Sequence, residues 1–532
     1  MAPPVHTGAR PADPPRPSSL AQAPPRTLLA ATLVAALLRL PGLGRPSLWI
    51  DEQFTLLAAG LPGPFDPLAL LGDVHGPLYT LAVAFAAALG GDAEWVLRLP
   101  SALAGVATVP AMAWLAGRWL GPGAVAPAAW LAAGSPFLVY YSQECRNYSF
   151  VLLATVLSLG AALGLRDRAD ARRVAGWLAT VVAGVLSNFA FVFVAPLQLR
   201  LLLAPGEALA RRRRLLAGAI VVVVLAAAPW VPAVVGTWDW ARLVPGREAP
   251  ATETGLRGEH TFHPAAIPFT LHTFTSGYGV GPSLRELRAG PAAAVRDHAL
   301  ELALAAALFA VLGGLGLRAV ARRGRLADTL LWLVAPMLVV SYFATTNFKV
   351  FHPRYLAAAM PCVLLVVAAA FADAAPRTRR VLALAVALLW SVSLARGAFD
   401  PDYGREDYRT AMAHVRAGLV PGERVLAVGA PEPVEWYGRG LEVRRFWLGY
   451  ASDEARLSRA WRDSVGAPPP GLWVVASRTE DLDPEGRFAR RLDGWTNEQD
   501  RSAFAGVRVW HLRERVTEDD SAGVVGPAQG SR

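Results

Sequence analysis

Long apolar segments recur along most of the chain, from Leu28 to Phe399. Each is long enough, or nearly long enough, to cross a hydrocarbon core of about 30 Å as a helix. They occupy residues 28–43, 76–90, 97–118, 124–142, 147–165, 174–187, 189–204, 215–235, 298–318, 327–346, 353–373 and 380–397. One soluble core cannot bury this much apolar surface, so the pattern predicts an all-α polytopic membrane protein.

Arginines between these segments predict which side of the membrane each loop occupies. Four basic clusters, expected to be cytoplasmic by the positive-inside rule, lie at residues 166–173, 211–214, 318–325 and 377–380. The Pro-rich residues 1–26 are predicted to be a disordered cytoplasmic tail. An even number of crossings is then required between residues 75 and 144, where three apolar segments lie, so one segment is expected to be re-entrant or half-crossing. We predict about eleven transmembrane helices, within a range of about ten to thirteen.

The same topology predicts that the opposite, non-cytoplasmic side carries the long loops and the C-terminal segment. Residues 27–399 form the expected membrane domain, with outer loops 44–75 and 236–297. Strand patterns lie at residues 425–428 and 472–475 (buried) and 507–510 (half-exposed), and amphipathic helix patterns at 405–417 and 452–463. We therefore expect a small soluble α/β domain over residues 400–515, followed by a disordered tail over 516–532.

Composition narrows the class of partner. The chain is 54% hydrophobic and only 18% charged, below the roughly 25% of charged residues in soluble domains. Its net charge of +10 comes mainly from arginines in short loops, a topology signal, so no nucleic-acid partner is expected. Cys145 and Cys362 fit neither a disulfide framework nor a metal-ligand spacing.

The first outer loop carries two candidate sites. In Trp49-Ile50-Asp51-Glu52, Asp51 either caps a short interfacial helix, with Glu52 supporting the helix dipole, or acts as a general base just above the membrane. The two roles are compatible. The loop ends in His75-Gly76-Pro77-Leu78-Tyr79, at a helix start that Pro77 favours. His75 is either an exposed residue before this helix or a phosphate or metal contact that faces Asp51.

A second outer segment, residues 140–148, places Glu144 and Arg146 between tyrosines that include Tyr148. One interpretation is a structural ion pair within an aromatic belt. The other is a functional site, because ionisable groups near membrane depth are costly and commonly functional.

A third outer segment holds Lys349, the only lysine of the chain, with His352 and Arg354. These groups lie at a helix start, against the positive-inside trend. The pattern predicts an anion site, most naturally for the phosphate or pyrophosphate of a lipid carrier in the membrane. The alternative is contact with lipid headgroups by snorkelling.

The loop 236–297 carries a weak metal pattern and an aromatic stretch. Its candidate ligands are Glu259, His260, His263 and His272. Their spacing matches no recognised zinc pattern, so a divalent metal ion stays an open alternative. Three aromatic residues predict an amphipathic stretch along the membrane interface: Phe269, Phe274 and Tyr278.

Four ordered segments resemble the GT-C superfamily of polytopic glycosyltransferases, in the branch of protein O-mannosyltransferases and the lipid A aminoarabinose transferase. They are residues 49–52, 75–79, 98–103 and 141–148, and the Arg354-Tyr355 pair also fits. The resemblance covers about residues 28–400. Family members often have two prolines after the histidine, and Gly76 takes the first place here.

The resemblance implies transfer of a hexosyl or pentosyl group from a polyprenyl-phosphate carrier, with inversion, to a lipid, glycan or protein acceptor. The expected location is the extracytoplasmic face of the plasma (inner) membrane. By resemblance, Asp51 is the catalytic base, and Glu52 supports its loop or helps to hold a cation. The groups that neutralise the leaving phosphate are then Arg146, Lys349, His352 and Arg354, and the supporting residues are His75, Tyr79, Glu144 and Tyr148.

Three other classes of protein stay open. A lipid-linked saccharide ligase or polymerase uses similar donors but is usually organised around a later large loop. A transporter predicts inverted repeats and ionisable groups near the midplane, whereas this chain shows no repeat and carries its ionisable groups at the outer helix ends. A non-catalytic membrane scaffold is the third alternative.

Overall fold

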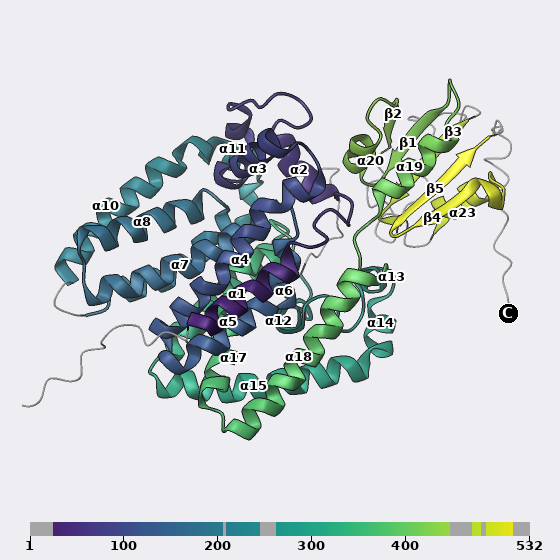
Figure 1. The fold of residues 1–532 in the computed structure, drawn as a ribbon. Helices are drawn as coiled ribbons and strands as arrows, with labels where there is room; N and C mark the ends of the chain where they lie inside the picture. The colour runs from purple at the N-terminus through teal and green to yellow at the C-terminus, as the bar shows by residue number, and fades with distance from the viewer. Residues whose placement is uncertain are drawn as a thin grey trace, which may run out of the picture.

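A helical part up to Phe399 and a small C-terminal sheet make up the computed structural model, which describes residues 25–205, 209–244, 262–446, 471–479, 483 and 486–513 (Figure 1). The predicted tails lie outside the described residues, except that Pro25 and Arg26 begin helix α1 (Pro25–Arg39). Glu259, His260 and the predicted helix 452–463 also lie outside them.

Within the described residues, seven helices are long and apolar enough to cross a membrane. They are α4 (Glu94–Trp119), α7 (Tyr148–Asp167), α10 to α11 (Leu209–Thr237), α15 (Ala299–Arg322), α16 (Leu326–Thr345), η6 with α17 (Pro353–Asp373) and α18 (Pro376–Phe399). This confirms a polytopic, mainly helical membrane protein. The count of about eleven crossings stays a prediction, because α1, α3 (Pro77–Gly90), α8 (Ala171–Val185) and η3 with α9 (Phe189–Leu202) are shorter.

A broken helix lies in the interval where the topology requires an unusual segment. The helix pair Pro122–Gly134 (η2 and α5) and Pro136–Ser142 (α6) is bent by 53° and counts as an eighth span if it crosses as one unit. Pro136 begins α6, and the Ser135 hydroxyl accepts a hydrogen bond from the Leu138 amide at 3.4 Å. This pair is either a broken span or a re-entrant loop, and it leads the chain into residues 143–147, so the re-entrant or half-crossing segment stays a prediction.

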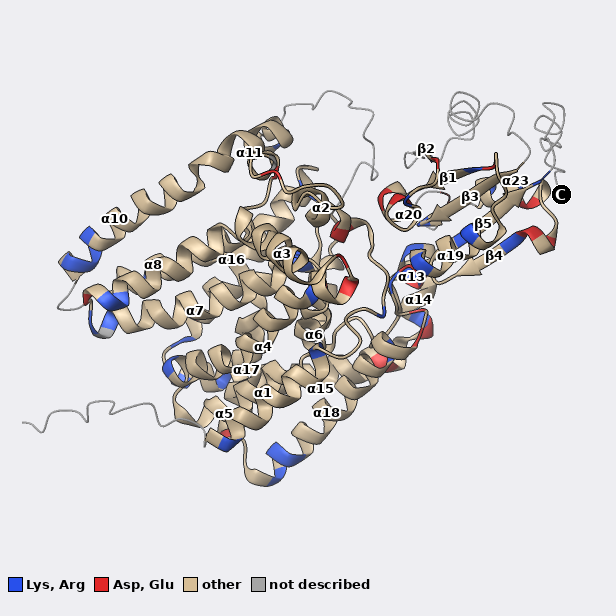
Figure 2. Cartoon of the chain, turned by 45° about the horizontal axis from the view of Figure 1, so that its top comes forward, with Lys and Arg blue, Asp and Glu red and all other residues tan. Residues whose placement is uncertain are grey.

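The four basic clusters lie along the edge of the helical part that is remote from the C-terminal sheet (Figure 2). Two arginines of the 318–325 cluster pair with the Asp373 carboxylate, Arg322 and Arg323, each at 2.6 Å. A shared edge is what one cytoplasmic side requires. The orientation in the membrane itself stays a prediction.

The C-terminal sheet has five strands in the order β2-β1-β3-β5-β4. Their bounds are β1 (Arg424–Val428), β2 (Val443–Phe446), β3 (Leu472–Ser477), β4 (Arg501–Phe504) and β5 (Val507–Leu512). Strand β1 pairs in parallel with β2 and β3, whereas β5 runs antiparallel to β3 and β4. The predicted strands at 425–428 and 472–475 are confirmed.

Helices cover both faces of this sheet. Helix α19 (Tyr408–Gly418) packs on the side chains of Val425 and Val509, and α23 (Arg487–Gly494) packs on those of Leu426 and Trp510. Strand β5 is consequently more buried than its predicted half-exposed state, and only its Arg508 is exposed. The helix predicted from residue 405 starts at Tyr408, because the Asp407 carboxylate caps it by accepting from the Thr410 amide.

The remaining described elements are short. They are α2 (Ile50–Ala58), η1 (Ala69–Gly72), η5 (Trp240–Leu243), α12 (Ala266–Ser276), α13 (Leu284–Ala289), α14 (Pro291–Asp297), α20 (Pro431–Tyr437) and η7 (Glu498–Asp500). The prediction that the aromatic residues of 236–297 lie along the membrane interface is wrong for Phe274. Its side chain is fully buried and packs edge-on against Phe137, and the Tyr278 hydroxyl meets that of Tyr141 at 2.8 Å. These contacts with α6 bury the stretch in the helical core.

Candidate functional site

Glu52 anchors the loop that carries Asp51. Both Glu52 oxygens accept hydrogen bonds from Arg98, each at 2.7 Å, and neither side chain is exposed. The Trp49 amide also donates to this carboxylate, so Glu52, and not Asp51, caps helix α2. Burial raises the pKa of Glu52, but Arg98 and Arg405 lower it by more, and the net pKa lies below its usual value. Glu52 is thus an ionised structural group.

Asp51 points the other way, towards the start of η6. Its carboxylate pairs with the guanidinium group of Arg354, and its backbone carbonyl accepts from Arg146 at 3.0 Å. Burial raises the pKa of Asp51, whereas Arg354 and Arg146 lower it by more, so the net pKa is lowered. In this arrangement Asp51 is an anion with 18% of its side chain exposed.

The side chains of Glu144 and Arg146 do not pair with each other. Arg146 donates to Thr55 at 3.1 Å and to the Nε2 atom of His75 at 3.3 Å. The nearest cation recorded for Glu144 is Arg405, at 3.9 Å, and its Oε2 atom is buried with no hydrogen-bond partner among the described residues. Burial, opposed by Arg405, raises the pKa of Glu144 to about 7. The interpretation as a local ion pair is therefore wrong.

His75 lies at the entrance to α3 and faces Arg146. Because arginine can only donate, the Nε2 atom of His75 must accept, which makes the ring neutral. Burial lowers the pKa of His75 to about 3, and Arg146 and Lys349 add to this effect. The neighbouring Gly76 packs so closely against the end of α8 that an added Cβ would overlap the Leu186 carbonyl group. This contact fixes where His75 enters the site.

Lys349 and Arg354 approach the same space from the segment before α17. The Lys349 ammonium lies over the rings of Trp238 and Tyr355, at 5.4 and 5.0 Å from their centroids. The Nε atom of Arg354 is buried and has no hydrogen-bond partner among the described residues. His352 is less available to contact an anion, because its Nδ1 atom accepts a hydrogen bond from the Arg354 amide at 3.2 Å and so caps η6.

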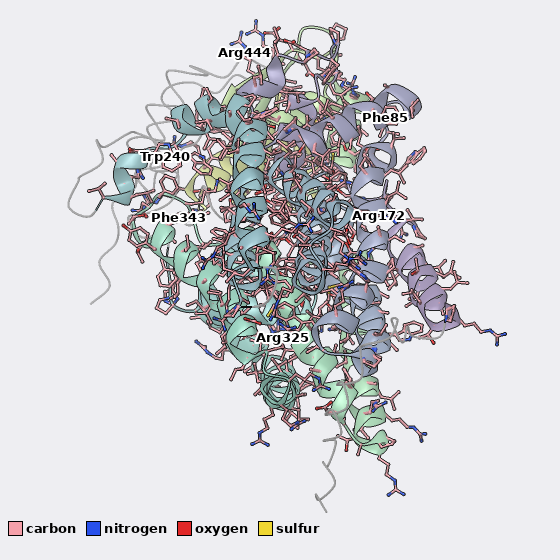
Figure 3. The ribbon with its side chains drawn as sticks, turned by 90° about the vertical axis from the view of Figure 1, so that its left-hand side faces the viewer. Phe85, Arg172, Trp240, Arg325, Phe343 and Arg444 are labelled. Atoms are coloured by element: carbon pink, nitrogen blue, oxygen red, sulfur yellow. The ribbon has the colours of Figure 1, made fainter. Side chains whose placement is uncertain are left out.

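A cavity of about 1060 Å³, here called the large cavity, joins most of the predicted residues. Its polar lining includes Asp51, His75, Arg146, Tyr148, Lys349 and Arg354. Its apolar lining includes Phe54, Leu57, Val192, Phe193, Val339 and Phe343. Of the wall residues, Phe343 and Trp240 lie on one flank of the helical part (Figure 3). The cavity therefore combines a cationic end with a long apolar wall.

A second cavity of about 140 Å³, here called the small cavity, lies on the side of the C-terminal sheet. Its lining includes Asp51, Glu144, His352, Arg354, Arg405 and Arg478. Asp51 and Arg354 line both cavities, so the carboxylate stands where they adjoin. Glu52 and Tyr79 line neither. Tyr79 supports the site indirectly, because its hydroxyl bonds Ser101, which donates to the Arg146 carbonyl.

Two arginines at the site had no role in the sequence-based prediction. Arg98 lies inside one of the resembling segments, and the signal for it was a charge within an apolar helix, which requires a buried partner. Arg405 follows the last membrane helix, and nothing in its local pattern indicates that it reaches Glu52 and Glu144.

The described residues do not fit a divalent metal ion. They contain no group of three or more His, Cys, Asp or Glu side chains close enough to hold one. Glu52 is saturated by Arg98, and Asp51 is paired with Arg354. The two described histidines of the weak metal pattern have structural bonds: His263 accepts from the Ala265 amide, and His272 bonds the Val280 carbonyl.

Comparison with known proteins gives a match of part of the chain to one family model and a likeness of fold to solved structures. Residues 74–232 match the model of the dolichyl-phosphate-mannose-protein mannosyltransferase family. The structure of ArnT from Cupriavidus metallidurans in the apo state is similar, with a TM-score of 0.53 and 14% identity, over 94% of this chain and 98% of that one. ArnT from the same organism bound to undecaprenyl phosphate gives a TM-score of 0.52 and 15% identity, over 95% and 100%. No curated protein sequence matches this chain.

Proposed function

We propose that this chain, which has a fold similar to that of ArnT and matches the mannosyltransferase family model over residues 74–232, is a membrane glycosyltransferase of the GT-C superfamily. It transfers a sugar from a polyprenyl-phosphate carrier to an acceptor hydroxyl. One observation carries this proposal: the Asp51 carboxylate stands between a cationic, apolar-walled cavity and a small polar one.

The large cavity suits a lipid phosphate. Arg146, Lys349 and Arg354 supply the positive charge that a phosphate needs, and they line one end of the cavity. The wall continues along α16 from Ala335 to Phe343, a length of about 12 Å at 1.5 Å per residue. A prenyl chain would lie along this wall. The ArnT structure with undecaprenyl phosphate supports a carrier of this chemical class.

The reaction needs a base and a stabilised leaving group. The acceptor oxygen attacks the anomeric carbon while the bond from that carbon to the phosphate oxygen breaks, and Asp51 takes the hydroxyl proton. Negative charge builds on the departing phosphate, where preorganised cations stabilise it. Attack from the side opposite the phosphate inverts the anomeric centre.

Arg354 couples the two halves of this chemistry. In the structure it lowers the pKa of Asp51, whereas burial raises it. A phosphate that takes over the Arg354 guanidinium removes part of the lowering effect, so the pKa of Asp51 rises and the carboxylate becomes a stronger base. Donor binding would thereby activate the base. Of the two roles predicted for Glu52, supporting the loop and holding a cation, we favour the first, because Arg98 donates to both of its carboxylate oxygens.

The small cavity is our candidate for the acceptor side. A water needs only about 10–15 Å³ by this kind of measure, so about 140 Å³ admits a group of several atoms. A lipid, a glycan and a protein side chain each offer a hydroxyl that could enter it. The basic clusters on the remote edge favour an extracytoplasmic site in the plasma (inner) membrane.

The test is transfer from labelled polyprenyl-phosphate sugars into a membrane acceptor fraction by the purified protein in proteoliposomes. Loss of general-base catalysis costs about 10²–10⁴-fold, so Asp51→Asn should lose transfer by that factor. Asp66→Asn is the matched control, because this carboxylate of the same loop is exposed and bonds only its own turn. Equal transfer by wild type and Asp51→Asn would refute the catalytic assignment. Label that crosses the bilayer without becoming bound to an acceptor would indicate a transporter instead.

A further inference from the structure

Arg405 enters the site from the chain that follows the last membrane helix. Its side chain is only 10% exposed and lies 3.6 Å from Glu52 and 3.9 Å from Glu144. It also donates to the Gln143 carbonyl at 3.1 Å and lies over the Tyr140 ring. One guanidinium group thus joins the Asp51–Glu52 loop, the Glu144 segment and the C-terminal segment.

Three carboxylates gather here, and each has a different cation. Asp51 pairs with Arg354, Glu52 with Arg98, and Glu144 has only Arg405 within 4 Å in the part of the chain that the structure describes. A buried carboxylate beside two others requires such compensation, because an unpaired buried charge costs several kcal/mol. The position of Arg405 therefore affects the charge state of Glu144 and the placement of its neighbours.

The docking of the C-terminal part fixes that position. The Leu48 amide donates to the Tyr437 hydroxyl at 2.7 Å, and the Tyr408 amide donates to the Ser47 hydroxyl at 3.0 Å. Trp49 and Ile50 pack against the sheet core beneath α19. The residues that flank Asp51 are consequently held by the C-terminal part on one side and by the membrane helices on the other.

We propose that Arg405 is a positioning residue of the transfer reaction, through which the C-terminal segment holds the Asp51–Glu52 loop and the Glu144 carboxyl in their working arrangement. This inference rests on the proposed function and deepens it. Docking of the C-terminal part then becomes a condition of catalysis, since the membrane part alone lacks Arg405, the cation that lies within 4 Å of Glu144. A residue with a merely structural role would affect stability alone.

The pH profile separates these two roles. The charged groups that face Glu144 are Arg405, Glu52, Arg354 and Asp51, and the hydroxyls of Tyr140, Tyr141 and Tyr278 face it as well. Glu144 lines the cavity that Asp51 lines, so its ionisation changes the field at the base and the rate should change near pH 7. Arg405 lowers the pKa of Glu144, and losing a cation at this distance raises a carboxyl pKa by about 1–3 units.

The experiment compares Arg405→Gln, Arg405→Lys and Arg439→Gln in the full-length protein in proteoliposomes. Arg439 is the matched control, because it pairs with Asp92 across the same docking interface and neither residue lines the large or the small cavity. We expect Arg405→Gln to lower kcat by about ten- to hundredfold, with the donor KM little changed. The change of rate near pH 7 should move to a pH higher by about 1–3 units. Arg405→Lys should keep the change of rate near pH 7, because the positive charge remains. Its kcat should fall by about tenfold, because a lysine lacks the planar guanidinium group with its several donors.

The outcomes are distinguishable. Arg439→Gln should keep the wild-type kcat and pH profile. If the wild-type rate does not change near pH 7, or if this change stays at the same pH in Arg405→Gln, the inference is overturned. If Arg405→Gln does not fold, a wild-type kcat in Arg405→Lys overturns it as well. If Asp51→Asn is inactive while the Arg405 variants behave like Arg439→Gln, only this inference fails. If Asp51→Asn retains full transfer, the proposed function itself fails.

Discussion

Removal of Arg98 is the sharpest test of how the site is held together. The Arg98 guanidinium is fully buried and makes two bonds to Glu52 at 2.7 Å. It also donates to the backbone carbonyls of Leu43, Pro46 and Ser47 at 2.7, 2.8 and 3.0 Å. These three carbonyls belong to the loop that leads to Asp51. The substitution Arg98→Met keeps an unbranched stem like the aliphatic part of arginine and deletes all five bonds.

The magnitude follows from burial. Removing one partner of a buried ion pair costs about 3–5 kcal/mol, because the other charge is left uncompensated. Each buried carbonyl that loses its donor adds about 1–3 kcal/mol. The sum is comparable with a total stability of about 5–15 kcal/mol. We therefore expect Arg98→Met to be poorly folded or strongly destabilised.

The double variant Arg98→Met/Glu52→Leu isolates the contribution of the Arg98–Glu52 ion pair to stability. It removes both charges, so it should be more stable than the summed effects of the single variants predict, by several kcal/mol. It should still be less stable than wild type, since the Leu43 and Ser47 carbonyls lose the Arg98 donor and Pro46 keeps only the Arg409 bond at 3.3 Å.

The measurement is the apparent Tm of each purified variant in one detergent. Arg173→Met is the control, because the Arg173–Asp170 pair is exposed and such pairs contribute about 0–1 kcal/mol. If Arg98→Met lowered the Tm no more than Arg173→Met, the interpretation of Arg98 and Glu52 as the anchor of the Asp51 loop would be refuted. If the fall in Tm of the double variant equalled the sum of the two single variants, the proposed contribution of the ion pair would be refuted.

Three further predictions concern the large cavity and its entrance. Lys349→Met should raise the donor KM by about tenfold or more, as expected for the loss of a hydrogen bond to a charged group. If initial rates show an unchanged KM, Lys349 does not bind the donor phosphate. Gly76→Ala should lower both the Tm and the transfer rate, because its Cβ would overlap the Leu186 backbone; a fully active, stable variant would show that this contact can relax. The folded-state pKa of His75 is lowered to about 3, below the unfolded value of about 6.5. The unfolded state therefore binds more protons between these values, and stability falls as the pH drops through this window. His75→Asn should lose less Tm between pH 7 and 5 than wild type, and identical losses would contradict a neutral, buried ring.

Much of the fold was predictable because it depends on local pattern. Apolar length requires membrane helices, and the basic clusters share one edge because charge sets loop location. The strands at 425–428 and 472–475 follow from short apolar runs. Local pattern did not predict the burial of β5, because that depends on helices that cover both faces of the sheet.

What the sequence by itself determined about the site is which groups are chemically unusual for their place: Asp51 and Glu52 in the first loop, Glu144 with Arg146, and Lys349 with Arg354. The tertiary structure alone decided their partners. Glu52 pairs with a residue 46 positions away, Asp51 with one 303 positions away, and Gln143 bonds Arg405 across 262 positions. A buried charge must have a counter-charge, but the chain can supply it from any element that packs nearby. Sequence spacing therefore identifies the charges, whereas only packing separates the residues that support the loop, as Glu52 does, from those that face the cavities, as Asp51 does.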